Sequence, residues 1–319
     1  MLSRKLFFIL ALPVIILTSC VKDIDQQAQY SQNDGLKATT RTIVTNLGTG
    51  FNSIFAQYEK DSLEQASIIQ NFTHNARFLD DESGYIFAET FSGFNISHPV
   101  NLNIEGTSTI GQVDAFGKEI VAEMINLAKY TGFGFLEYDY ENPATGLVER
   151  KTSFVKAIPE ISWYVGAGFY HLDDEPFITA QEINEQVVIQ SVTVMAKGLG
   201  AIFENHISDS IQGVNWMRAF LGNIRFFDNQ SGYFFVIDYS GYNVVQPPNP
   251  DFQGTYEWDF QDSKGNFLVQ DLIETAQSGG GFYEYYWENY QTGAEERKKA
   301  FVKEIPGKDY LIGSGVYLK

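Results

Sequence analysis

The sequence predicts an α+β protein that contains two copies of one folding unit. Two segments, Arg77–Pro99 (RFLDDESGYIFAETFSGFNISHP) and Arg225–Pro247 (RFFDNQSGYFFVIDYSGYNVVQP), align without a gap. Self-similarity of this kind indicates an internal duplication. An amphipathic helical pattern precedes each copy, and strands separated by turn residues follow it. A helix followed by a run of strands is typical of an α+β fold with a mainly antiparallel sheet.

The strands are predicted from residue type and turn chemistry. Asp228–Gly232 (DNQSG) is a turn cluster, because Asp, Asn and Ser bond their own backbone and Gly supplies a positive φ. The aromatic and β-branched run Tyr233–Asp238 then predicts a half-buried strand. Further along, Phe135–Pro159 matches Phe282–Pro306, which predicts a long hairpin in each copy. Nearly the whole chain after the N-terminal region is therefore duplicated.

The helices are predicted from apolar spacing and capping. Apolar residues recur every three or four positions from about residue 40 to 75, and we expect Gly48 and Gly50 to kink or break this helix. Thr179–Glu182 (TAQE) forms a capping box, which starts a second long helix that we expect to reach about Leu221. The predicted domains are 36–172 and 173–319, after a leader at 1–19 and a flexible, Gln-rich tether at 20–35.

The N-terminal region predicts export. The apolar run Leu6–Leu17 follows Arg4 and Lys5, as in a secretory signal, and is too short for a comfortable membrane span. Leu17-Thr18-Ser19-Cys20 resembles a bacterial lipobox, in which the cysteine is acylated and anchors the protein to the membrane. An ordinary signal peptide that contains a cysteine is the alternative. We expect no later segment to span a membrane, no output domain after the second copy, and a location on the periplasmic face or the cell surface.

Composition excludes several classes of function. The formal charge of −18 argues against nucleic-acid binding, and 44% hydrophobic residues argue against disorder. The sequence contains no phosphate-binding loop, dinucleotide fingerprint, serine elbow or metal-type histidine spacing. Asp80-Asp81-Glu82 is interpreted as a turn rather than a calcium loop, since its counterpart Asp228-Asn229-Gln230 loses charge. We therefore expect no enzyme, no cofactor and no metal site.

The repeated aromatic residues are candidates for a ligand pocket. Under strand alternation Tyr85 and Phe87 share one face, and Tyr233 and Phe235 share the corresponding face of the second copy. Aromatic walls with a few placed polar groups are typical of small-molecule sites. The alternative is that these aromatics are ordinary core residues.

Two matched polar positions bear on the choice of ligand. An inward-pointing Arg77 or Arg225 would clamp an anion, whereas an outward one would be solvated or would pair with a nearby aspartate. His98 precedes a proline in the first copy and is replaced by Gln246 in the second. Because only the histidine can change charge near neutral pH, the two pockets need not bind the same ligand.

These motifs resemble the Cache superfamily, and in particular its single-Cache type 2 module. The resemblance rests on the ordered recurrence of a long helix, R-[FL]-x-D-x-x-S-G-Y-x-F, a glycine-led short helix, G-F-x-E-Y, F-V-K-x-I-P and a final G-x-G-x-Y, twice in the chain. It implies two PAS-like modules, each with a long N-terminal helix packed on an antiparallel sheet, and binding of small metabolites such as organic acids outside the cytoplasm. Carried over by position, the pocket residues are Arg77, Tyr85, Phe87, His98, Phe135 and Tyr138, and Arg225, Tyr233, Phe235, Gln246, Phe282 and Tyr285.

The resulting hypothesis is a lipid-anchored, extracytoplasmic binding protein that hands its ligand or signal to a membrane sensor or transporter. The alternative is a scaffold lipoprotein whose pockets are filled by its own side chains. An enzyme would need titratable residues that converge in a cleft.

Overall fold

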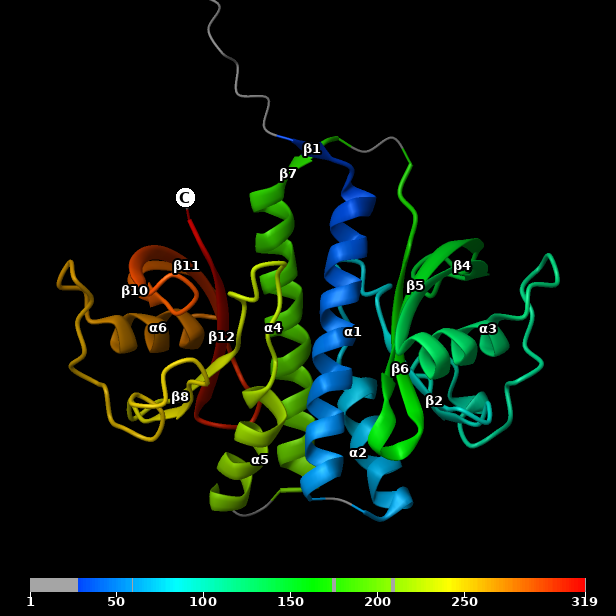
Figure 1. Cartoon of the computed structure of the whole chain (residues 1–319), viewed down its shortest axis with the longest axis horizontal. Helices are drawn as coiled ribbons and strands as arrows, with labels where there is room; N and C mark the ends of the chain where they lie inside the picture. Colours follow the sequence, from blue (N-terminus) through cyan, green and yellow to red (C-terminus); the bar gives the residue numbers. More distant parts are fainter. Residues whose placement is uncertain (1–27, 59, 174–175, 208–209, 319) are drawn as a thin grey trace, which may run out of the picture.

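The two copies form two modules on either side of a central pair of parallel helices (Figure 1). The computed structural model describes residues 28–58, 60–173, 176–207 and 210–318. The central helices are α1 (Gln32–Gln57) and α4 (Ala180–Asn205), and each packs against the sheet of its own module. The short helices α3 (Ile120–Asn126) and α6 (Leu268–Gln277) cover the outer faces of the two sheets. Each sheet is therefore enclosed between a long helix and a short one.

The two sheets have the same topology. Each has five antiparallel strands, in the order β3-β2-β6-β5-β4 in the first module and β9-β8-β12-β11-β10 in the second. The strands of the first sheet are β2 (Ile86–Thr90), β3 (Asn95–Ser97), β4 (Phe133–Glu141), β5 (Val148–Ile158) and β6 (Trp163–Tyr170). Those of the second are β8 (Phe235–Asp238), β9 (Asn243–Val245), β10 (Gly281–Asn289), β11 (Ala294–Glu304) and β12 (Tyr310–Tyr317). The predicted α+β class and the duplication are confirmed.

The remaining elements are short or complete the helical layer. Helices α2 (Ser62–Asn75) and α5 (Ser210–Gly222) follow the two long helices, and β1 (Gln29–Tyr30) pairs with β7 (Ile178–Thr179) ahead of them. Helical turns at Leu102–Ile104, Leu127–Thr131 and Pro159–Ile161 lie in the connections of the first module.

Glycines in α1 do not break the helix, contrary to expectation. Helix α1 continues through Gly48 and Gly50, and the break falls instead before Asp61, whose side chain caps α2 by accepting from Leu63 N and Glu64 N. A glycine in a helix costs about 1 kcal/mol relative to alanine. Here close packing offsets that cost, because a Cβ on Gly50 would lie 2.7 Å from the ring of Phe220.

The second long helix is likewise divided. The predicted capping box is confirmed: the Thr179 hydroxyl accepts from Glu182 N, and the Glu182 carboxylate accepts from Thr179 N. The expectation of one helix to about Leu221 is wrong, because α4 ends at Asn205 and α5 begins at Ser210.

The same glycine–phenylalanine contact occurs twice at the interface between the modules, once from each long helix. Gly50 on α1 admits the ring of Phe220, and its counterpart Gly198 on α4 admits the ring of Phe72, 2.3 Å from where a Cβ would lie. Phe51 joins them, with its ring centre 5.5 Å from that of Phe72 and 5.3 Å from that of Phe220. One buried apolar cluster consequently runs through both modules. The two copies pack as the two halves of a symmetric dimer do.

The described residues include only part of the N-terminal region interpreted above. The leader at 1–19 and the lipidation candidate Cys20 lie outside the described residues. The flexible tether predicted for 20–35 is wrong at its C-terminal end, since β1 pairs with β7 there and Ser31 forms a capping box with Asp34 at the start of α1. That signal, a serine three residues before an acid, was present in the sequence.

Helix α4 is more apolar than we expected. Within the described residues it is the one helix long and apolar enough to cross a membrane by length and composition, contrary to the expectation that no later segment is. In the fold 72% of its most apolar window is buried, and it packs against α1, α2 and β12. Its apolar character therefore supplies the shared core.

Candidate functional site

The candidate site lies on the face of the first sheet that points away from α1. Helix α3 covers this face, and a separate buried cluster lies between the two. Its members include Tyr85 and Phe87 from the start of the sheet, Leu136 and Tyr138 from β4, and Met124 from α3. Strand alternation places these residues on one side and leaves the other side for the long helices.

A lysine ammonium sits in the middle of this face among aromatic rings. Lys151 is 0% exposed, and its Nζ lies 3.8 Å from the centre of the Tyr85 ring, 5.0 Å from that of Tyr170 and 5.3 Å from that of Tyr140. Among the described residues no hydrogen-bond acceptor reaches this nitrogen. Burial lowers the pKa of Lys151 well below its ordinary value, and the nearby Arg77 lowers it further. The rings stabilise the ammonium only in part.

A second cation approaches the same ring. The Arg77 guanidinium carbon lies 5.5 Å from the centre of the Tyr85 ring, and the buried Nη1 has no acceptor in the described part of the chain. Burial lowers the pKa of Arg77, while Tyr85 and Glu82 oppose that shift. Of the two orientations considered above, the structure shows the inward one. A buried guanidinium nitrogen with a free hydrogen-bonding position is costly unless something occupies it.

His98 completes the set of donors. The ring is 6% exposed, with its centre 5.2 Å from that of Tyr85, and its Nδ1 finds no partner among the residues that the structure describes. Nε2 lies 3.5 Å from the Tyr140 hydroxyl. Burial, followed by the positive charge of Lys151, lowers the pKa of His98 to about 3. The imidazole is therefore neutral near pH 7 and can donate or accept one hydrogen bond.

Hydroxyl groups line the rest of the face. Tyr138 hydrogen-bonds Ser153 at 2.9 Å, and burial raises the pKa of Tyr138. The Tyr140 hydroxyl accepts from Gln112 Nε2 at 3.2 Å. Two cations, a neutral imidazole and tyrosine hydroxyls around one ring form a candidate site, and donors of these kinds suit a small anion such as a carboxylate.

One buried acid lies on the same sheet, and its oxygens are already occupied. Glu89 accepts from the Tyr164 hydroxyl at 2.6 Å, from Asn95 Nδ2 at 3.0 Å and from the Thr109 hydroxyl at 3.1 Å. Burial raises the pKa of Glu89, and these hydrogen bonds oppose the shift. Its contacts tie the loop after β3 to the sheet, so Glu89 is a structural group at the edge of the site.

The second module has the same groups, but they are paired internally. Lys298 is 1% exposed and donates to the Tyr233 hydroxyl at 2.8 Å. Burial lowers the pKa of Lys298 to about 7. Arg225 donates through Nη1 to the carbonyls of Gly222 and Ile224 at 3.0 and 2.7 Å. Both cations of the second module therefore have hydrogen-bond acceptors, whereas Lys151 Nζ and Arg77 Nη1 have none among the described residues.

The second pocket is also nearly full. A cavity of about 20 Å³ lies between Phe235, Gln246, Tyr285 and the side chains of α6. That volume accommodates about one water molecule. The second face therefore closes on its own side chains.

Comparisons with known proteins agree with this architecture. A family model described as Cache domain matches residues 14–211, and a second, Single Cache domain 2, matches residues 178–319. The first match alone covers more than half of the chain. The chain belongs to the Cache family.

The relatives are sensor proteins. Over 135 residues the chain is 30% identical to the sensor histidine kinase MctS of Rhizobium johnstonii. The matched stretch is 42% of this chain and 29% of the kinase. It therefore spans less than a third of that kinase's length.

Similar solved structures include a chemotaxis protein and two domains described as sensory. A methyl-accepting chemotaxis protein of Vibrio parahaemolyticus is 26% identical, covering 43% of this chain and 89% of its own, with a TM-score of 0.36. A periplasmic sensor domain of a chemotaxis protein is 23% identical, covering 44% and 95%, with a TM-score of 0.39. A Cache chemosensory domain described for carboxylic acid recognition is 22% identical, covering 44% and 92%, with a TM-score of 0.38.

Most predicted pocket residues of the Cache modules lie together, and two do not. Tyr85, Phe87, His98 and Tyr138 share the outer face of the first sheet. Phe135 is wrong as a pocket residue, because alternation along β4 turns it to the long-helix side, where its ring packs on Phe154 at 4.6 Å.

The second copy repeats this outcome. Tyr233, Phe235 and Tyr285 share the outer face, and Gln246 lines the small cavity there. Phe282 is wrong for the same reason as its counterpart, since it packs on Phe301 beside the long helices. A period-two reading anchored on Tyr285 would have excluded it.

The sequence reasoning missed the two lysines at the centre of the Cache pockets. Lys151 and Lys298 occupy matching positions in the duplicated hairpin strand, and each sits two residues before the next inward side chain. The available signal was a lysine repeated in both copies on the strand face that carries the buried aromatics. The charged residues next to it made it resemble part of a solvent-exposed strand end.

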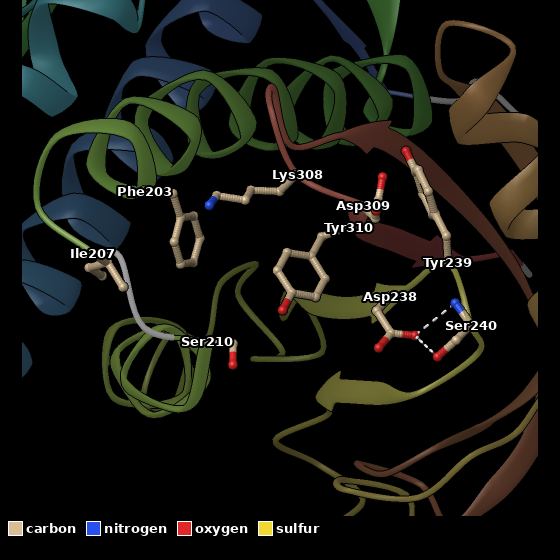
Figure 2. A pocket seen from close by; sticks show the side chains of 9 residues that line it. All are labelled: Phe203, Ile207, Ser210, Asp238, Tyr239, Ser240, Lys308, Asp309 and Tyr310. Atoms are coloured by element: carbon tan, nitrogen blue, oxygen red, sulfur yellow. Dashed lines mark hydrogen bonds between the residues drawn. The ribbon is translucent and has the colours of Figure 1, made fainter.

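A larger hollow lies elsewhere in the second Cache module. It is a depression of about 410 Å³ at the end of α4. Phe203, Tyr310 and Lys308 lie on its wall (Figure 2). Its other polar lining includes Asp309 and Asp238, whose carboxylate accepts from Ser240. Two carboxylates on the wall oppose an anion, so the buried face of the first module remains the better candidate. Within the described residues no group of three or more His, Cys, Asp or Glu side chains could hold a metal ion.

Proposed function

We propose that this Cache protein is a lipid-anchored, extracytoplasmic binding protein whose first module captures a small organic anion. One observation carries the proposal. Three buried nitrogen atoms around the Tyr85 ring, Arg77 Nη1, Lys151 Nζ and His98 Nδ1, have no partner within the described residues. Each costs free energy when unpaired, and a carboxylate placed among them would satisfy all three.

The chemistry limits the ligand. Two buried cations favour one or two carboxylate groups, and the rings of Tyr85 and Tyr140 provide an apolar wall for a short carbon chain. The description of carboxylic acid recognition by another Cache chemosensory domain supports the same class of ligand. We propose binding alone and no chemical step.

Attachment and signalling complete the proposal. The lipobox-like Leu17-Thr18-Ser19-Cys20 supports acylation of Cys20, and the match to a sensor histidine kinase supports a role in sensing. The ligand or signal would then pass to a membrane sensor or transporter. Acylation is tested by metabolic labelling with a palmitate analogue, in which Cys20→Ser should abolish the label.

Ligand binding is tested by thermal shift of the full chain with acetate, pyruvate and succinate. A ligand that binds only the native state must raise the melting temperature. We expect at least one of these acids to do so in the wild type and not in Arg77→Gln/Lys151→Met. Equal shifts in both proteins would overturn the assignment of the site.

The scaffold alternative is favoured by one observation, the nearly filled cavity of the second module. It predicts no shift with any acid in the wild type. The two functions are therefore separated by the same experiment.

A further inference from the structure

The hairpin turns of the two modules differ at four positions, and one of these lies next to the pocket. The segments Glu141–Arg150 (ENPATGLVER) and Glu288–Arg297 (ENYQTGAEER) correspond residue for residue, so that Tyr290 stands where the first module has Pro143.

The turns themselves are built alike. Asn142 Nδ2 donates to Glu149 at 2.8 Å, and Asn289 Nδ2 donates to Glu296 at 3.0 Å. In both, the turn closes with a glycine N–H that donates to the asparagine carbonyl at 2.7 Å. The backbone therefore presents position 143 and position 290 in the same place, and only the side chain differs.

Tyr290 reaches back over the second pocket. Its ring centre lies 5.8 Å from that of Tyr233, in an edge-to-face arrangement. The Arg225 guanidinium carbon lies 5.7 Å from the centre of the Tyr290 ring. The Tyr290 hydroxyl donates to the carbonyl of Gln230, which belongs to the turn just after Arg225. In the first module Arg77 contacts the Tyr85 ring directly, at 5.5 Å.

We infer that Tyr290 closes the second module by taking the place of a ligand, so that the chain binds one organic anion and not two. The phenol ring contacts both Arg225 and Tyr233, and Lys298 is paired with the Tyr233 hydroxyl. The inference rests on the proposed function of the first module and adds that Tyr290 determines which module binds the anion.

The proposal is tested by the stoichiometry of binding, measured by calorimetry on the full chain with acetate, pyruvate and succinate. We expect one equivalent in the wild type. Opening the second module with Tyr290→Pro/Gln246→His, which restores the first module's residues at both positions, should give two equivalents. Adding Arg225→Gln should return the value to one.

The reciprocal change is a matched control. Pro143→Tyr should close the first module and weaken its binding at least tenfold, whereas Pro143→Ala should leave it unchanged. Tyr290→Phe keeps the ring and loses only the bond to Gln230, so it should remain closed. Circular dichroism verifies that each variant is folded.

The outcomes separate the two proposals. Two equivalents in the wild type, or a value unchanged by Tyr290→Pro/Gln246→His, would overturn the role of Tyr290 while leaving the first site intact. If the wild type binds none of the acids, the proposed function fails. The opened variant then decides the inference alone: binding that depends on Arg225 supports it, and no binding overturns it.

Discussion

The Lys151 ammonium lies 3.8 Å from the centre of the Tyr85 ring and is fully buried, with no acceptor among the described residues. Its counterpart Lys298 lies 4.0 Å from the Tyr233 ring and donates to the Tyr233 hydroxyl. Duplication has thus kept the buried lysine in both modules but has left only one of them without a hydrogen-bond partner. This difference leads to predictions for stability as well as for binding.

Replacing Lys151 by methionine should stabilise the protein without ligand and weaken its binding of an anion. Methionine fills a similar volume and removes the cost of burying an unpaired cation, which we expect to raise the free energy of unfolding by about 1 kcal/mol or more. Loss of a charged hydrogen-bond donor should weaken acetate or pyruvate binding by roughly tenfold or more. Urea denaturation and calorimetry measure the two effects.

Lys298→Met serves as the control for that experiment. It removes a lysine of equal burial from the other module, so it should leave binding of the acid unchanged. A similar loss of affinity in both variants would show that the effect is structural and not local to the first site.

The pKa of Lys298 predicts a stability that increases with pH above neutrality. Its folded-state pKa is about 7, against about 10.4 in an unfolded chain. Between these values the unfolded chain binds the proton and the folded chain does not, so the free energy of unfolding rises with pH, by at most about 1.4 kcal/mol per pH unit. Below pH 7 Lys298 is protonated in both the folded and the unfolded state, so it adds no pH dependence to the free energy of unfolding.

Urea denaturation between pH 7 and 9.5 measures this slope. Lys298→Met should flatten it, because methionine does not titrate. An identical slope in the wild type and the variant would contradict the shifted pKa.

The lowered pKa of His98 predicts a loss of stability at acidic pH. Burial and Lys151 hold its pKa at about 3 in the folded state, against about 6.5 when unfolded. Stability from this group is complete above pH 6.5 and is lost as the pH falls through the folded-state pKa, since the unfolded chain takes up the proton first. His98→Gln, which introduces the residue of the second module, should therefore reduce the loss of stability between pH 6.5 and 4. A steeper acid loss in the variant would contradict the prediction.

The interface glycines should not tolerate a methyl group. In an unconstrained helix Gly→Ala stabilises by about 1 kcal/mol, whereas a Cβ on Gly198 would lie 2.3 Å from the ring of Phe72. We expect Gly198→Ala to destabilise the protein by about 1–3 kcal/mol, as overpacking of a dense core does. Guanidinium denaturation measures the change.

A second variant tests the cause. Phe72→Leu removes the ring, so Gly198→Ala should cost less in that background than in the wild type. Additive costs would show that the ring does not limit the glycine.

Much of this arrangement could be predicted from residue patterns, and the errors have physical causes. The turn at Asp80–Glu82 was predicted correctly, since Asp81 accepts from Ser83 N within it. Gly50 was misread because a helix glycine weakens the helix locally, while the gain from the Phe220 ring comes from the other module. Phe135 was misplaced because its family position was given more weight than its strand alternation.

The sequence by itself determined the duplicated unit, the α+β class, the second capping box and the presence of aromatic residues on one face of each sheet. These follow from local propensity, turn chemistry and periodicity, which neighbouring residues control. Only the tertiary structure decided that no acceptor among the described residues reaches Lys151 Nζ, that Lys298 donates to Tyr233, and that Tyr290 lies against Arg225. Those properties depend on which side chains from distant strands meet in a buried space, and hydrogen-bond satisfaction there cannot be read from spacing along the chain.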